Sequence, residues 1–272
     1  MTHSFGLKLD RAREHLQAFE QEAEAWVKTK PYAIVDEPDP NPPPQPIGNA
    51  VVIQRRFRVT RVDPVPGRLS LILGDCLFNI RSSLDHLALY LAKNHTPNMT
   101  PTQIRGSEFP IFQKPPSRPE ERRKIGYVAP AVRSVIMALQ PYHRGNTYHT
   151  HPLWQIHELN NIDKHRMLTV CITSPSVGGE KQVRFQVKEG GWNLQPIYIA
   201  AKETELKIDA IIMQYAGILI DPNRDTNADP LIPLEVTFGP GGPTALELIV
   251  PTVQAFCDFV RDSVIIPLAG GW

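Results

Sequence analysis

A short stretch of one amphipathic segment carries arginine, aspartate and histidine together. Arg81, Asp85 and His86 lie within 69–94, where leucine and isoleucine recur at steps of three and four, which predicts a long core helix. Asn79 extends this polar strip by a further half turn. Arginine binds phosphate with a planar fork, and histidine exchanges protons near neutral pH. These residue types therefore suit chemistry at an anionic group.

Histidines are concentrated in a second segment that begins before a helix predicted over 152–166. Five of the nine histidines fall between positions 143 and 165. The candidate side chains of this segment are His149, His151, His157, Glu158, Lys164 and His165. Imidazole and carboxylate groups also form zinc, iron and manganese sites, which indicates a metal-dependent hydrolase or oxidase as one alternative.

The spacing of these histidines speaks against a metal site built by this helix alone. His157-Glu158 would need a second histidine at position 161 to form H-E-x-x-H, but Asn161 stands there. A divalent ion shared by His149, His151, His157 and His165 stays open as an alternative. The other interpretation is that these histidines cap, pack and bridge to loop carbonyls.

The spacing Arg81-Ser-Ser-Leu-Asp-His86 resembles the R-x4-H motif of HEPN proteins, which are helical bundles. The resemblance implies metal-independent endoribonuclease activity of the toxin or defence type. His86 would act as the general acid or base at the ribose 2′-hydroxyl, and Arg81 would stabilise phosphate charge. Asp85, His157, Lys164 and His165 would support them. It also implies a homodimer and no cofactor.

A non-catalytic reading of the same residues stays open. Arg81 and Asp85 are four apart and could form an ion pair along the helix, with His86 packed in the core. The chain would then be a HEPN-like binding or assembly module. The wider pattern around 74–93 and 151–166 also resembles a widespread group of bacterial proteins to which no activity is assigned, and this likeness suggests that the two polar helices form one unit.

The elements that must position these side chains indicate an α+β fold, a HEPN-like helical bundle packed beside an antiparallel sheet. Helices are predicted over 5–28, 69–94, 152–166 and 251–267, with a shorter pair starting at Pro119 and Pro130. Strands are predicted over 50–62, 168–173, 182–187, 206–212 and 234–238. We expect a single domain over 1–272, with a proline-rich loop at 37–47 and a β-rich region at 167–240.

Charge and composition limit the kinds of partner, nucleic acid or membrane, that the chain is expected to bind. With 29 basic and 28 acidic residues the net charge is +1, so an RNA partner would need a local patch. The candidate patches are Arg55, Arg56 and Arg58 with Arg61, and Arg118, Arg122, Arg123 and Lys124 beside Tyr127. No leader or membrane span is evident, which indicates a cytoplasmic protein without a membrane partner. The sequence lacks G-x-S-x-G, phosphate-loop and dinucleotide fingerprints.

Overall fold

The computed structural model divides the chain into two compact units. The described residues are 3–41, 51–173, 176–177, 180–181, 184–187, 194–201, 206–221, 228–231 and 234–270. One unit takes three segments, 1–23, 66–170 and 238–272, and the other takes 24–65 and 171–237. The chain therefore passes between the two units several times. That both units unfold together, as one domain, stays a prediction.

The first unit is helical. Its helices are α1 (Ser4–Lys28, of which the last turn belongs to the second unit), α2 (Gly67–His95), α3 (Pro101–Gly106), α4 (Arg118–Ile125), α5 (Pro130–Ala138), the 3₁₀ segment η1 (Pro141–Thr150), α6 (Pro152–His165), α7 (Ile249–Phe259), the π-helical segment η2 (Val260–Ile265) and α8 (Ile266–Ala269). The predicted long helices are confirmed to within two residues at each end, when α7, η2 and α8 are taken as one continuous helix.

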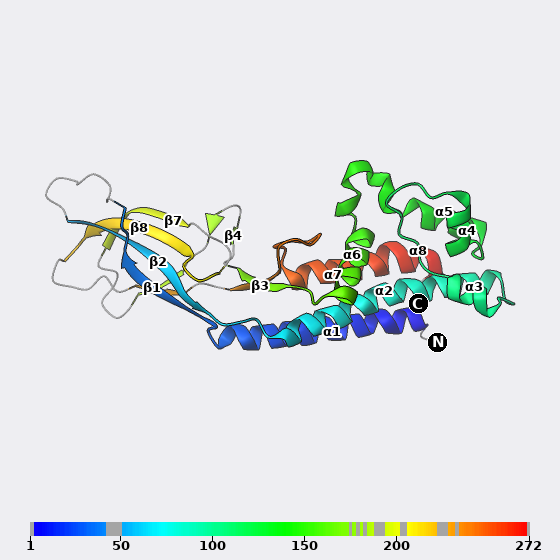
Figure 1. Ribbon diagram of the computed structural model, residues 1–272, viewed down its shortest axis with the longest axis horizontal. Coiled ribbons are helices and arrows are strands. Elements are labelled where there is room, and N and C mark those ends of the chain that lie inside the picture. The colour runs from blue at the N-terminus through cyan, green and yellow to red at the C-terminus, as the bar shows by residue number, and fades with distance from the viewer. Residues whose placement is uncertain are drawn as a thin grey trace. The chain divides into compact units, whose positions relative to one another are not determined.

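Helices α1 and α2 run antiparallel, side by side (Figure 1). Their cross-links show the direction, because Ser83 Oγ donates to the carbonyl of Phe5 while Cys76 Sγ donates to that of Ala12. The leucine and isoleucine stripe predicted on α2 is buried along its whole length: Leu69, Leu73, Leu77, Ile80, Leu84, Leu87 and Leu91. Tertiary burial of this stripe, more than helix propensity, therefore fixes α2 in place.

Gly74 lies where α2 meets α6. A Cβ atom at this position would collide with the carboxylate of Asp163 on α6. A glycine inside a helix costs about 1 kcal/mol relative to alanine. Gly74 therefore allows α2 and α6 to pack closely, and this approach brings the polar residues of the two helices together.

The last helix changes its winding before Pro267. Proline lacks the N–H that an α-helix needs at that position, and its ring crowds the preceding turn. The backbone responds with η2, a wider turn, and then resumes as α8 until Gly270, whose φ of 73° ends the helix.

The second unit is built on an antiparallel sheet ordered β1-β2-β8-β7. Its strands are β1 (Tyr32–Pro38), β2 (Val52–Val62), β7 (Leu194–Ala201) and β8 (Ile211–Leu219). Short strand pairs accompany it: β4 (Ser176–Val177) with β5 (Glu180–Lys181), β6 (Arg184–Val187) with β9 (Ala228–Leu231), and β3 (Val170–Thr173) with β10 (Glu235–Phe238). Phe57, Met213 and Tyr215 form an apolar cluster on one sheet face.

Several local expectations need correction. The strand predicted over 206–212 begins only at Ile211, because Asp209 adopts a left-handed backbone conformation with φ 66° and turns the chain. The proline-rich segment from 37 contains the end of strand β1, and 42–47 lie outside the described residues. A capped helix, α3, was missed within 95–118, although Thr100 and Gln103 form a capping box there.

The α+β part of the predicted fold is confirmed, and the HEPN-like arrangement of the helices stays a prediction. Helices and antiparallel strands occupy different parts of the sequence, which is the α+β arrangement. In the part of the chain that the structure describes, no helix is both long and apolar enough to cross a membrane.

Candidate functional site

Arg81 and Asp85 hold a neighbouring segment against α2. Arg81 Nη2 lies 2.9 Å from Asp85 Oδ1 and donates to the carbonyl of Phe109 at 3.0 Å. The N–H of Phe109 donates in turn to Asp85 Oδ1 at 3.0 Å. Arg81 is 8% exposed and Phe109 is fully buried. The three residues therefore form a closed clamp in which a buried charge satisfies a buried peptide group.

A second ion pair adjoins this clamp. Lys124 Nζ on α4 lies 2.7 Å from Glu108 Oε1. Burial alone would raise the pKa of Glu108, but the hydrogen bond and charge of Lys124 lower it overall. Burial raises the pKa of Asp85, against the opposing effects of Arg81 and the Phe109 N–H. Segment 108–109 is thus tied to both α2 and α4.

His157 stands beside these charges as a neutral imidazole. Burial, followed by the nearby charges of Arg81 and Lys124, lowers the pKa of His157 to about 4. Its Nε2 lies 3.0 Å from Asn161 Nδ2, one turn further along α6. Its Nδ1 and Arg81 Nη1 are both buried and find no hydrogen-bond partner among the described residues. A histidine with this pKa is a weak base at neutral pH.

His86 does not share a face with Arg81. Five positions along an α-helix turn the side chain by about 140°. His86 is half-buried, and no hydrogen bond or ion pair joins it to another described residue. Within one copy of the chain, therefore, the two residues of the R-x4-H motif do not converge on one point.

The remaining candidate site residues on α2 and α6 make contacts that are common on helices. Asn79 is buried, donates to the carbonyl of Asp75 at 2.8 Å and accepts from Lys8. Glu158 is half-buried on α6, whereas Lys164 and His165 are exposed in its last turn. Cations at a helix C-terminus interact favourably with the helix dipole. The ammonium group of Lys164 therefore suits this end of α6.

The histidines before α6 act as caps and ring contacts. His151 is the N-cap of α6, and its Nδ1 accepts from the N–H of Leu153 at 3.2 Å. Burial lowers the pKa of His151 to about 4. His149 is exposed and lies edge-on to Tyr148 and Trp154. Among the side chains described, no group of three or more His, Cys, Asp or Glu is placed to hold a metal ion.

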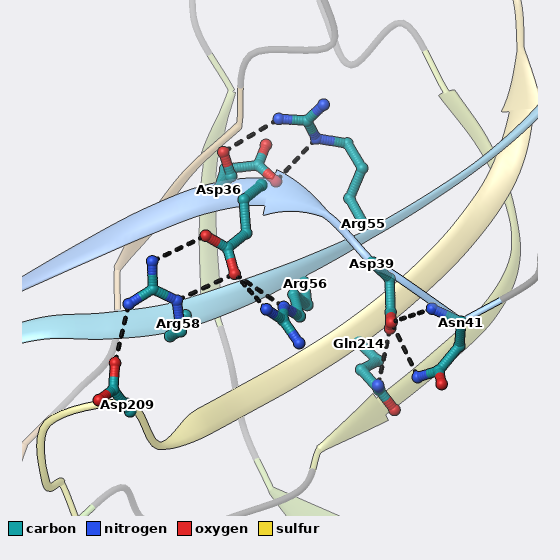
Figure 2. Close-up of polar contacts among 9 residues, drawn as sticks. Asp36, Asp39, Asn41, Arg55, Arg56, Arg58, Asp209 and Gln214 are labelled. Atoms are coloured by element: carbon teal, nitrogen blue, oxygen red, sulfur yellow. Dashed lines mark hydrogen bonds and ion pairs between the residues drawn. The ribbon is translucent and has the colours of Figure 1, made fainter.

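The basic run on β2 is neutralised by acids from distant positions (Figure 2). Arg55 Nε donates to Asp36 Oδ1 at 2.8 Å. Arg56 and Arg58 both bind Glu37, at 2.7 and 2.9 Å. The hydrogen bonds from these two arginines lower the pKa of Glu37 to about 2.

The same neutralisation extends beyond β1. Arg58 also pairs with Asp209, and Arg61 pairs with Asp63. The positive patch expected here for RNA is therefore a charge-balanced ladder. On α4, by contrast, Arg118, Arg122 and Arg123 are exposed and form no ion pair with any described residue.

Glu108 and the Phe109 peptide group were not predicted from the sequence, and Lys124 was predicted only as part of a basic patch. The segment around Phe109 shows as a short apolar run between prolines. No spacing rule connects it with Asp85, which precedes it by 24 residues. Only the fold reveals this contact.

Comparison with protein-family models found no matching family, and the same holds for curated proteins and for solved structures. Proposals about function therefore rest on the site itself.

Proposed function

We propose that this chain is a HEPN-like binding and assembly module, working as a homodimer, in which Arg81 and Asp85 stabilise the fold. The observation that carries this proposal is the buried clamp on Phe109. If Arg81 turned towards an RNA phosphate, it would leave the Asp85 carboxylate and the Phe109 carbonyl without their partner. The Phe109 carbonyl would then be buried and unpaired, which costs about 1 to 3 kcal/mol, and the Asp85 carboxylate, whose side chain is 36% exposed, would lose its cation.

Exposed apolar side chains on α2 offer a surface for self-association. Leu71 is 59% exposed and Phe78 is 50% exposed. They are seven positions apart, which places them on the same face of the helix. Large apolar side chains on one exposed helix face favour burial against a partner.

The mass of the purified chain by light scattering tests this proposal. We expect a dimer for the wild type and a monomer for Phe78→Glu, because a charge at the interface would have to be desolvated. Val135→Glu, which changes an exposed apolar residue on α5, should remain a dimer. A monomeric wild type, or a dimeric Phe78→Glu variant, would contradict the assembly proposal.

A metal-independent endoribonuclease is the second candidate function. In its favour, the exposed Arg122 and Arg123 on α4 directly precede Lys124, whose charge acts on His157. A dimer could also bring His86 of one copy near Arg81 of the other, as the HEPN resemblance implies. An RNA partner, a cytoplasmic location and a toxin or defence role belong to this candidate and stay predictions, as does the metal-dependent alternative.

Cleavage of a mixed single-stranded RNA separates the two candidates. A ribonuclease should lose activity in His86→Ala while its melting temperature is unchanged. The binding-module proposal predicts no cleavage by the wild type above that of a heat-denatured control. Cleavage that His86→Ala abolishes would therefore decide for the enzyme.

A further inference from the structure

A pocket of about 190 Å³ opens in the helical unit, between the end of α6 and the turn that follows β10. Its walls combine the apolar side chains of Leu159, Leu168 and Phe238 with the backbone of the Gly239–Gly242 turn. A cavity of about 150 Å³ in another protein holds benzene, so this volume suits a molecule with one small ring.

Thr244, which lines the pocket, has a hydroxyl group without a hydrogen-bond partner among the described residues. The residue is fully buried. Its carbonyl accepts from the N–H of Glu247 at 3.0 Å, so the backbone is held in place. A buried hydroxyl without a partner is destabilising. Because Thr244 has no exposed surface, a ligand in the pocket reaches this hydroxyl through a small shift of the adjoining Gly241–Gly242 turn.

Arg166 supplies a cation to the same lining. It is the C-cap of α6, its N–H donates to the carbonyl of Ile162 at 2.9 Å, and its side chain is exposed. Its guanidinium forms no ion pair with a described residue, unlike Arg56 and Arg58. An unpaired guanidinium beside a pocket favours a carboxylate, which it binds with two parallel hydrogen bonds.

We propose that this pocket binds a small organic carboxylate. The apolar body lies against Leu168 and Phe238, the carboxylate binds Arg166, and Thr244 Oγ1 donates a hydrogen bond to the ligand. The polar contacts fix the orientation of the ligand, and the apolar wall supplies the burial, as in most small-molecule sites. This site is separate from the clamp at Arg81 and from the proposed dimer face, so its failure leaves both of those proposals standing.

Benzoate is the probe for the test, and calorimetric titration of the full chain is the measurement. We expect saturable binding of one benzoate per chain. Benzyl alcohol has the same ring without the charge, and it should bind about tenfold more weakly or worse, since a charge-assisted bond is lost. Absence of saturable benzoate binding would overturn the proposal, and equal affinity for benzyl alcohol would overturn the assignment of a carboxylate.

Thr244→Val tests the hydroxyl with a side chain of nearly the same shape. We expect benzoate affinity to fall about tenfold, while the melting temperature of the free protein stays equal or rises, because a buried unpaired hydroxyl is removed. Thr237→Val is the matched control, since Thr237 Oγ1 is also buried without a partner but does not line the pocket. It should leave benzoate affinity unchanged. Unchanged affinity in Thr244→Val would contradict the assigned contact.

Two further variants test the role of the Arg166 guanidinium and the location of the probe in the pocket. Arg166→Gln should weaken benzoate binding about tenfold, whereas Arg118→Gln, at another exposed arginine, should not. Gly242→Leu should add bulk to the pocket lining and weaken benzoate binding, because a Cβ at Gly242 meets no atom within 4 Å and its φ does not demand glycine. Full benzoate affinity in Gly242→Leu would show that the probe binds elsewhere and would overturn the proposal.

Discussion

The two units treat their arginine and acid pairs in opposite ways. In the helical unit the side chain of Arg81 is 10% exposed and that of Asp85 is 36% exposed. Asp85 and the carbonyl of Phe109 are the only described partners of Arg81. On the sheet, the side chains of Arg56 and Arg58 are 25% and 29% exposed and share Glu37 with each other (Figure 2). Asp85 is the single carboxylate partner of Arg81 among the described residues, whereas Glu37 binds two arginines and keeps one of them if the other is lost. We therefore expect the loss of Arg81 to destabilise the protein more than the loss of Arg58.

Removal of Arg81 should produce the largest effect. Arg81→Ala leaves the buried Phe109 carbonyl and the partly exposed Asp85 carboxylate without their cation, and we expect a loss of about 3 kcal/mol in the free energy of unfolding. Urea denaturation followed by circular dichroism measures it. Arg58→Ala is the matched control on the sheet. A loss under about 1 kcal/mol for Arg81→Ala would contradict the clamp.

The approach of α2 to α6 should be the next most sensitive feature. Gly74→Ala places a methyl group against the Asp163 carboxylate, and overpacking of this kind costs about 1 to 3 kcal/mol, less the gain in helix propensity. The double variant Gly74→Ala with Asp163→Ala removes the collision. In urea denaturation it should recover most of the loss, and failure to recover would place the strain elsewhere.

Acid should weaken the helical unit through its neutral histidines. Burial lowers the pKa of His157 and of His151 to about 4, below the ordinary value of 6.5. The unfolded chain therefore binds more protons than the folded one between these values, and stability falls as pH drops from about 6.5 to about 4.

His157→Gln provides the control for this pH dependence. The variant should show a shallower decrease over the same range, with the part due to His151 remaining. Melting temperatures at half-unit steps of pH measure both slopes. Parallel slopes for the wild type and the variant would mean that His157 is not held neutral by the fold.

The smallest effect is expected on the sheet. Arg58→Ala breaks pairs with Glu37 and Asp209, but Arg56 still binds Glu37, and the Asp209 side chain is 74% exposed. We expect a loss of about 1 kcal/mol, part of which is screened by salt. The loss measured in urea should shrink further at 1 M sodium chloride. If Arg58→Ala lowered the free energy of unfolding as much as Arg81→Ala does, the expected difference between the ion pairs of the two units would be wrong.

The long helices and the core stripe of α2 were predictable because periodicity in sequence becomes burial in space. The pairing of Arg81 with Asp85 also followed from their spacing of four. Strand β1 was hidden by the prolines around it, and the late start of β8 depends on the backbone of Asp209. Arg56 and Arg58 bind Glu37, and Asp85 binds the N–H of Phe109. These contacts join residues far apart in the sequence, so local sequence patterns do not predict them. For this reason the arginines of β2 were predicted to form a basic patch, although acids from other parts of the chain neutralise them.

A double-mutant cycle on Arg81 and Asp85 tests most directly whether these residues act as one structural clamp. The variants are Arg81→Leu, Asp85→Leu and both together, and the measurement is the free energy of unfolding in urea. The account predicts that the double variant is more stable than the sum of the single losses implies, with a coupling energy of about 1 to 3 kcal/mol. Losses that add within about 0.5 kcal/mol would contradict it.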